Sequence, residues 1–191
     1  ANGLILDDFL AWIVGEVGLI QGLLNEALLT DWNRVRPVGA PHAVREGLIS
    51  PADLGARLLA SFPHNFGEIG IAVVNGEGYT SRELNTGKDI ETIARIRPLA
   101  AVDGAEKLEF LAGYAHGSRG SASTRANRSL LGARWVDTAW GLGFDWMGIK
   151  GLNLDGGREG SLFSGYLHAE PIASWILVGR ASLFQRNQQD S

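Results

Sequence analysis

The chain has 191 residues, a formal net charge of −4 and no cysteine. The absence of cysteine excludes disulfides, thiolate nucleophiles and cysteine-ligated zinc. A chain of this length is most simply one domain, residues 1–191, which buries about 70% of the surface that its unfolded form exposes. Glycine occurs 26 times, about twice the usual share of ~7%. Such a content indicates many tight turns and close backbone contacts.

Residues 1–32 are predicted to form one long helix. Apolar residues such as Ile13, Val17 and Ile20 recur at three- and four-residue steps along one face. A second face carries three glycines, at positions Gly15, Gly18 and Gly22. Three glycines inside a helix cost about 2–3 kcal/mol relative to alanine. We therefore expect another element, in this chain or in a second subunit, to approach the glycine face closely.

The same apolar stretch is not expected to cross a bilayer. A spanning helix needs about 18–20 apolar residues without charges, whereas Glu16, Gln21 and Glu26 interrupt this one. Because no basic region precedes it, we expect no signal peptide. The sequence therefore predicts a soluble protein without a membrane span, cytoplasmic or assembled into a particle.

The middle of the chain combines a second helix with a hairpin. Ser50, Pro51 and Asp53 supply a cap, a first-turn proline and an acid for a helix over residues 50–62. The β-rich run after it and the Asn75–Gly76 turn predict a hairpin over residues 68–84. Further along, the periodicity of residues 90–99 fits a strand or a helix. A short helix is predicted over 104–114, and 123–131 fits a helix or a loop.

The last third is rich in tryptophan, phenylalanine, isoleucine and glycine. Recurring turn signals predict an antiparallel meander over residues 133–184, followed by a polar, frayed tail over 185–191. Together, the elements predict an α+β fold. In it, amino-terminal helices pack on a mostly antiparallel sheet that is formed largely by the carboxy-terminal half.

Charge is divided into two blocks of opposite sign. Five acids precede the first basic residue, Arg34, whereas residues 110–136 contain no acid and four arginines: Arg119, Arg125, Arg128 and Arg134. Such blocks favour recognition of a charged partner, including another copy of the chain. The arginine segment fits a solvated loop, a contact for an acidic protein surface, or a phosphate-binding site. A pI of about 5.6 argues against nucleic acid.

Six tryptophans are more than a chain of this size needs. On one regular strand, Trp135 and Trp140 would face opposite sides, because they are an odd number of residues apart. Tryptophan is enriched at binding hot spots, so Trp12, Trp135 and Trp140 are candidate interface residues.

The sequence contains no connected catalytic signature. The four histidines lack the spacing of a helical metal site, and no nucleophile elbow or phosphate loop is present. The segment from His116 through Ser118 to Arg119 resembles the His-Gly-Ser element of ADP-ribosyltransferases, a resemblance that implies binding of a nicotinamide ribose. That family also expects a tyrosine segment and a distant glutamate, whereas Tyr166 and Glu170 are only four residues apart.

These observations favour a non-enzymatic structural or assembly protein that self-associates or docks into a larger complex, such as a virion or a secretion apparatus. We expect a homo-oligomer or other protein partners, with an anionic ligand as a further option, and neither a cofactor nor a metal. The alternative is an enzyme for an anionic or nucleotide-like substrate, with His116, Ser118 and Arg119 at its site near the arginines of residues 119–134.

Overall fold

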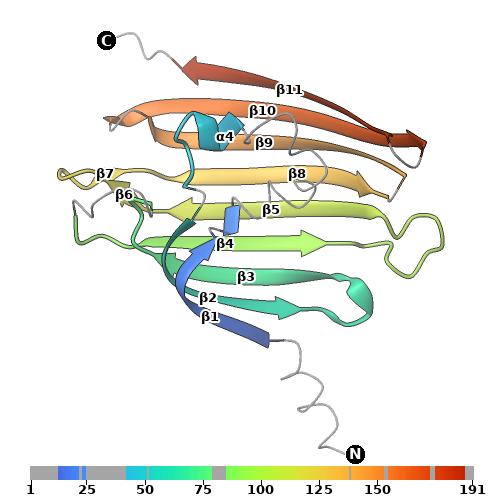
Figure 1. Cartoon of the computed structure of the whole chain (residues 1–191). Helices are drawn as coiled ribbons and strands as arrows, with labels where there is room; N and C mark the ends of the chain where they lie inside the picture. Colours follow the sequence, from blue (N-terminus) through green and yellow to red (C-terminus); the bar gives the residue numbers. More distant parts are fainter. Residues whose placement is uncertain are drawn as a thin grey trace, which may run out of the picture.

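A computed structural model describes residues 13–21, 23–24, 42–50, 52–78, 85–137, 139–152, 155–172 and 175–187. Its main feature is a nine-stranded sheet in the order β1-β2-β3-β4-β5-β8-β9-β10-β11 (Figure 1), in which every neighbouring pair is antiparallel. The strands are β1 (Ile13–Gln21), β2 (Ala52–Ser61), β3 (Gly67–Val74), β4 (Asp89–Ile96), β5 (Leu108–His116), β8 (Arg128–Val136), β9 (Trp140–Leu152), β10 (Asp155–Ile172) and β11 (Trp175–Asn187).

Three small elements accompany this sheet. The strands β6 (Ser118–Arg119) and β7 (Thr124–Arg125) form a two-stranded ribbon between β5 and β8. A short α-helix, α4 (His42–Arg45), precedes β2, and a 3-10 turn, η2 (Pro63–Asn65), joins β2 to β3. Within the described ranges, no helix is long and apolar enough to cross a membrane.

The predicted α+β fold is therefore wrong, because the described chain is nearly all antiparallel β-sheet. Residues 13–21 of the predicted first helix form β1, which pairs with β2 along nine positions. The spacing of Val17 and Ile20 fits a helix. It also fits a strand, in which Val17 and Leu19 are exposed on the outer face and Ile20 is buried on the inner face. The non-local pairing with β2 decides between the two patterns, as context often does for strands. The predicted first helix also includes residues 1–12, Gly22 and residues 25–32, which lie outside the described part, Trp12 among them.

The predicted second helix, 50–62, is also wrong, because residues 52–61 form β2. Leu54 and Leu58 are exposed on one face, while Asp53 and Arg57 lie on the other. The signals for a helix, a cap, a proline and an acid, involve only neighbouring residues of the sequence. β2 instead lies between β1 and β3 and forms backbone hydrogen bonds with both strands. Backbone pairing on two sides overrides a capping preference of about 1 kcal/mol.

The first strand of the predicted hairpin over 68–84 is present as β3, which pairs with β4. The predicted second strand, residues 79–84, lies outside the described part. The predicted short helix over 104–114 is wrong as well, since β5 begins at Leu108. Residues 123–131 supply β7 and the start of β8.

The antiparallel strands predicted over 133–184 are present as β8, β9, β10 and β11, with different bounds. Part of the predicted frayed tail belongs to β11, which continues to Asn187. The sheet is not formed largely by the carboxy-terminal half, because β1 to β5 all precede residue 117.

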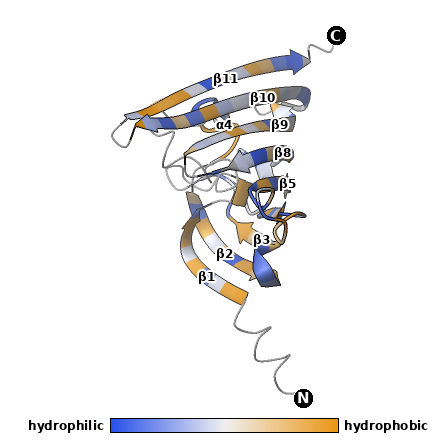
Figure 2. Cartoon of the chain, turned by 90° about the vertical axis from the view of Figure 1, so that its right-hand side faces the viewer, coloured by the Kyte–Doolittle hydropathy of each residue, from blue (hydrophilic) through white to orange (hydrophobic). Residues whose placement is uncertain are grey.

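The sheet is curved, and α4 lies on the inside of the curve (Figure 2). Two segments between β1 and β2, residues 23–24 and 42–50, cover this inner face. Leu23, Leu24 and Leu48 are among the most deeply buried side chains. They pack with inward-facing strand residues in one core: Ala72, Val74, Ile93, Leu111, Ala115, Leu130, Met147, Ile149 and Leu162. The opposite, outer face of the sheet carries no such cover within the described chain.

Candidate functional site

Two of the predicted arginines hold the inner segment 42–50 against the sheet. Arg128, at the start of β8, donates from Nε to the carbonyl oxygen of Leu48 (2.8 Å) and from Nη1 to that of Lys150 (2.6 Å). Arg119 donates from Nη1 to the carbonyl oxygen of Gly47 (2.9 Å). Arg128 is 5% exposed, so it is not part of a solvated loop. Both guanidiniums therefore donate to backbone carbonyl oxygens of the chain itself through N–H groups that could otherwise bind an anionic ligand.

Three carboxylates lie opposite these arginines on the inner face. Asp53 of β2 accepts hydrogen bonds from the backbone N–H groups of Gly76 (2.6 Å) and Gly78 (3.1 Å). Asp89 of β4 accepts one from the N–H of Ser118 (3.0 Å), and Glu91 accepts one from that of Leu23 (2.5 Å). The acids therefore order the turn after β3, the ribbon and the segment after β1.

Burial changes the acidity of this cluster. Loss of solvent raises the pKa of Asp89, although the Ser118 N–H and the charge of Arg119 oppose that change. Loss of solvent likewise raises the pKa of Glu91, against the donated N–H groups of Leu23 and Leu24. Burial, together with the like charge of Arg119, lowers the pKa of Arg128 to about 10. In each case removal from water disfavours the charged form.

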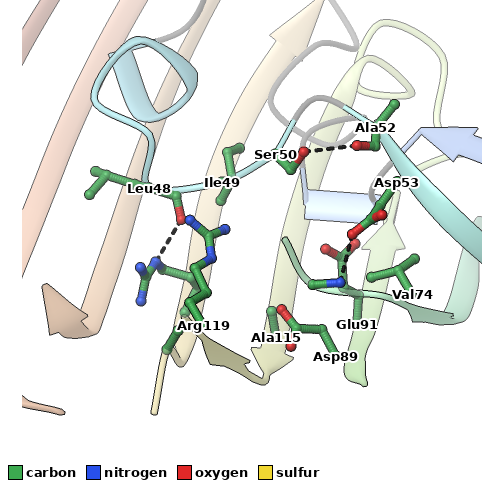
Figure 3. Close-up of a pocket in the computed structure, with 13 residues that line it drawn as sticks. Leu48, Ile49, Ser50, Ala52, Asp53, Val74, Asp89, Glu91, Ala115 and Arg119 are labelled. Atoms are coloured by element: carbon green, nitrogen blue, oxygen red, sulfur yellow. Dashed lines mark hydrogen bonds between the residues drawn. The ribbon is translucent and has the colours of Figure 1, made fainter. Parts of the chain in front are cut away.

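Between the acids and the arginines lies a small cavity. Figure 3 shows Asp53, Asp89 and Glu91 on one side of it and Arg119 on the other. Its volume of about 20 Å³ is the space that a single water molecule needs. Within the described residues, no group of three or more histidine, aspartate or glutamate side chains could hold a metal ion. The arrangement is thus suited to structural hydrogen bonding more than to binding an organic substrate.

A second, larger cavity lies at the opposite end of the inner face. Its volume is about 450 Å³, and it is lined by the β2–β3 turn and by residues around the ends of β4 and β5. Arg97 donates to Glu109 (2.9 Å) and to the side-chain oxygen of Asn65 (2.6 Å) there. Glu68 and Arg95 pair across its wall at 2.6 Å. Because its charges are already matched in pairs, this cavity has no excess of one sign.

The fourth predicted arginine, Arg134, is fully buried within an ion pair. It lies on the inner face of β8 and donates from Nη2 to Asp145 of β9 at 3.1 Å. Its guanidinium carbon lies 6.0 Å from the centre of the Tyr166 ring. Burial opposes its charged form, but Asp145, Tyr166 and Glu109 together raise the pKa of Arg134. This residue stabilises the sheet's inner face.

The remaining predicted site residues are dispersed. Arg125 is exposed in β7, and Ser118 lies in β6, where its N–H bonds to Asp89. His116, at the end of β5, pairs with Ile90 and is exposed on the outer face, away from the cavity beside Arg119. The structure therefore brings Arg119 and Arg128 together, but it does not place His116 with them.

The predicted interface residues fall at an edge and on the outer face. Gly15 and Gly18 belong to β1, an edge strand, where Gly18 has φ +128° and open space around it. Trp135 and Trp140 lie on neighbouring strands and stack with ring centres 5.7 Å apart and 10° between the planes. The expectation that they face opposite sides is wrong, because a turn between β8 and β9 separates them.

The outer face is the feature that sequence reasoning missed. Successive residues of a strand alternate between faces, and the strand register assigns large exposed hydrophobic side chains to this face on every strand of the sheet. One example from each strand, in sheet order, is Val17, Leu54, Ile71, Ile90, Phe110, Leu131, Phe144, Leu167 and Leu183.

Charge is nearly absent from the outer face. Among the described strands, the register places no aspartate or arginine there and only one glutamate, Glu159, which pairs with the one lysine on that face, Lys150, at 3.0 Å near one end of β9 and β10. The acids and arginines of the cavities lie on the inner face instead. The alternation Ile69–Ile71–Val73 was the signal that could have revealed this pattern.

A scan against protein-family models, a search of the curated proteins and a search of the solved structures each gave no match to this chain. The proposals below therefore depend on the geometry of this chain alone.

Proposed function

We propose that the chain is a non-enzymatic structural protein that functions as part of an assembly, with its outer sheet face covered by another apolar surface. The observation that supports this most is the row of exposed hydrophobic side chains across all nine strands. Proteins that are monomeric in water rarely expose contiguous apolar patches larger than a few hundred Å². An uncharged face on so wide a sheet therefore favours a partner.

The proposal keeps the assembly function predicted from the sequence but changes its contact surface. The glycine face of a helix and the arginine segment were the expected contacts. β1 is a strand, and Arg128 and Arg134 are buried, so the outer face takes over this role. β1 and β11 form the edges of the sheet within the described residues and offer a second means of association, since edge strands are sites for pairing with other strands.

The alternative of an enzyme with a site near His116 has less support. The cavity beside Arg119 has room for one water, and the arginines that line it donate to backbone carbonyl oxygens. A substrate site needs converging polar groups around space for the reacting atoms. The geometry thus favours a structural function over catalysis on an anionic substrate.

The test is the mass of the full chain in solution, measured by light scattering during size exclusion. We expect a mass above 20.5 kDa in aqueous buffer and dispersal by a mild detergent. Leu131→Lys places a charge on the outer face, while Val102→Lys makes the same change at a similarly exposed position (53% and 50%) outside the sheet. We expect only Leu131→Lys to change the mass. A monomer that neither variant alters would contradict the proposal.

A further inference from the structure

We infer that the surface covering the outer face is the hydrocarbon of a lipid bilayer. This inference rests on the proposed function and names the partner that the proposal leaves open. Except for the paired Lys150 and Glu159, the register places no acid, lysine or arginine of the described strands on that face. Protein interfaces ordinarily have a polar rim and cores that are only about 65% apolar. A face whose one ion pair lies near one end of two strands suits an apolar solvent.

The faces of this sheet differ from those of a sheet in water, because the inner face combines an apolar core with buried charges and the outer face is apolar as well. Antiparallel sheets in water turn apolar side chains to the core and polar ones to the solvent. Here the inner face holds the buried charges Glu109, Arg134 and Asp145, while Phe110 and Phe144, the sequence neighbours of Glu109 and Asp145, are about half exposed on the outside. Alternation with apolar residues outward and polar residues inward is the pattern of strands that cross a membrane.

Curvature favours a fluid partner over a second copy. The outer face is the convex side of the sheet, because α4 and the core lie inside the curve (Figure 2). Two convex surfaces touch only along a narrow strip, so an identical copy would leave most of the exposed strands uncovered. Lipid chains adapt to a convex surface and cover its full width.

The ends of the outer face match the two boundaries of a bilayer. At one end lie His116, Ser129 and the Lys150–Glu159 pair. At the other end the stacked pair Trp135 and Trp140 lies near the turn between β8 and β9. Tryptophan is enriched where hydrocarbon meets water, because its ring is apolar and its N–H is polar. The apolar band between these ends carries no charge.

Strand length agrees with this placement. A tilted strand of about 9–11 residues crosses the hydrocarbon core. β1, β5 and β8 have 9 residues each, β2 has 10, β9 and β11 have 13 and β10 has 18, while β3 and β4, with 8 each, are one residue shorter than this range. Strands of this length can extend from one boundary to the other.

The edges of the sheet connect this inference to assembly. Hydrocarbon offers no hydrogen-bonding partner to a backbone, so an open sheet edge is unstable within it. β1 and β11 each have a neighbouring strand on one side only within the described sheet. A bilayer location therefore requires that further strands pair with both edges. The earlier expectation of no membrane span considered only the amino-terminal apolar stretch as a helix.

Site-directed spin labelling tests the inference directly. Because the chain has no cysteine, each single-cysteine variant carries one label. Leu131→Cys probes the outer face, and Val102→Cys is the matched control outside the sheet. Both full-length variants are refolded into phosphatidylcholine vesicles, and the relaxation of each label is measured with molecular oxygen, which partitions into lipid, and with a water-soluble nickel chelate.

We expect the label at position 131 to be several-fold more accessible to oxygen than to the nickel chelate, and the label at position 102 to show the reverse. Protection of position 131 from both reagents would overturn the lipid inference while leaving assembly through a protein partner intact. Ready access of the nickel chelate to position 131 would overturn both. Failure of the unlabelled chain to associate with vesicles on flotation would also overturn the lipid inference.

Discussion

Arg128 and Leu48 are 80 positions apart in the chain, yet the Nε of Arg128 donates to the carbonyl oxygen of Leu48 at 2.8 Å. This contact joins the inner segment 42–50 to β8, in the middle of the sheet. With its two further bonds, to the carbonyl oxygens of Asn127 and Lys150, the guanidinium connects three separate parts of the backbone. A residue predicted to bind a partner thus binds the chain's own interior.

Replacing this guanidinium tests its structural role. Arg128→Met retains the aliphatic stem but removes all three donated hydrogen bonds, and it leaves buried carbonyl oxygens without them. We expect the free energy of unfolding to fall by about 2–4 kcal/mol. Denaturant titration followed by tryptophan fluorescence measures the change. The matched control Arg125→Met alters an exposed arginine of the same segment, and we expect its effect to stay within about 0.5 kcal/mol. Equal effects would show that Arg128 does not hold the inner segment.

The buried carboxyl of Glu91 should make stability depend on pH. Burial raises its pKa in the folded chain above the ordinary glutamate value of 4.5. Between pH 4.5 and the raised pKa, the folded state therefore binds more protons than the unfolded state. As a result, the free energy of unfolding falls as the pH rises through the pKa of the folded state. Relative to Glu91→Gln, the wild-type chain should be most stable at low pH and should lose that advantage as Glu91 ionises.

Denaturant titrations of both proteins across a range from about pH 4 to pH 8 measure this difference. Glu91→Gln is a suitable comparison, because the amide oxygen can still accept the N–H of Leu23. Two stability curves that run parallel through the whole range would contradict the pKa shift.

Gly151 provides a test of backbone packing at the end of β9. Its φ of +76° disfavours any other residue, and an added Cβ would lie 1.6 Å from the carbonyl oxygen of Arg125. Gly104 has a similar φ of +81° but open space around it. Alanine should cost about 1–2 kcal/mol at Gly104 from backbone strain. At Gly151 we expect at least about 2 kcal/mol more, because backbone atoms must move. Thermal unfolding of the two variants measures the difference, and similar values would contradict it.

Part of this fold could be predicted from local sequence patterns. The antiparallel strands over 133–184 were expected because turn signals separate runs rich in tryptophan, phenylalanine and isoleucine, and β8 to β11 follow each other as neighbours in the sheet. The first strand of the 68–84 hairpin was also expected. In these regions local propensity and final pairing agree, so the sequence pattern was sufficient.

The amino-terminal strands could not be predicted in the same way. Val17 and Ile20 in β1, and Leu54 and Leu58 in β2, fit a helical period as well as a strand. The choice between the two depends on hydrogen bonds to strands that lie distant in sequence. A single-sequence pattern contains no information on such non-local pairing, and β-propensity depends strongly on context.

By itself, the sequence determined that the chain lacks thiol chemistry, that four arginines lie in an acid-free segment, and that its last third forms antiparallel strands. Only the tertiary structure decided that Arg128 and Arg134 turn inward and that the hydrophobic side chains of nine strands share one exposed face. The reason is physical: composition and spacing are local properties, whereas the face on which a side chain lies depends on the register between strands. A shift of one residue in that register moves every side chain of a strand to the opposite face.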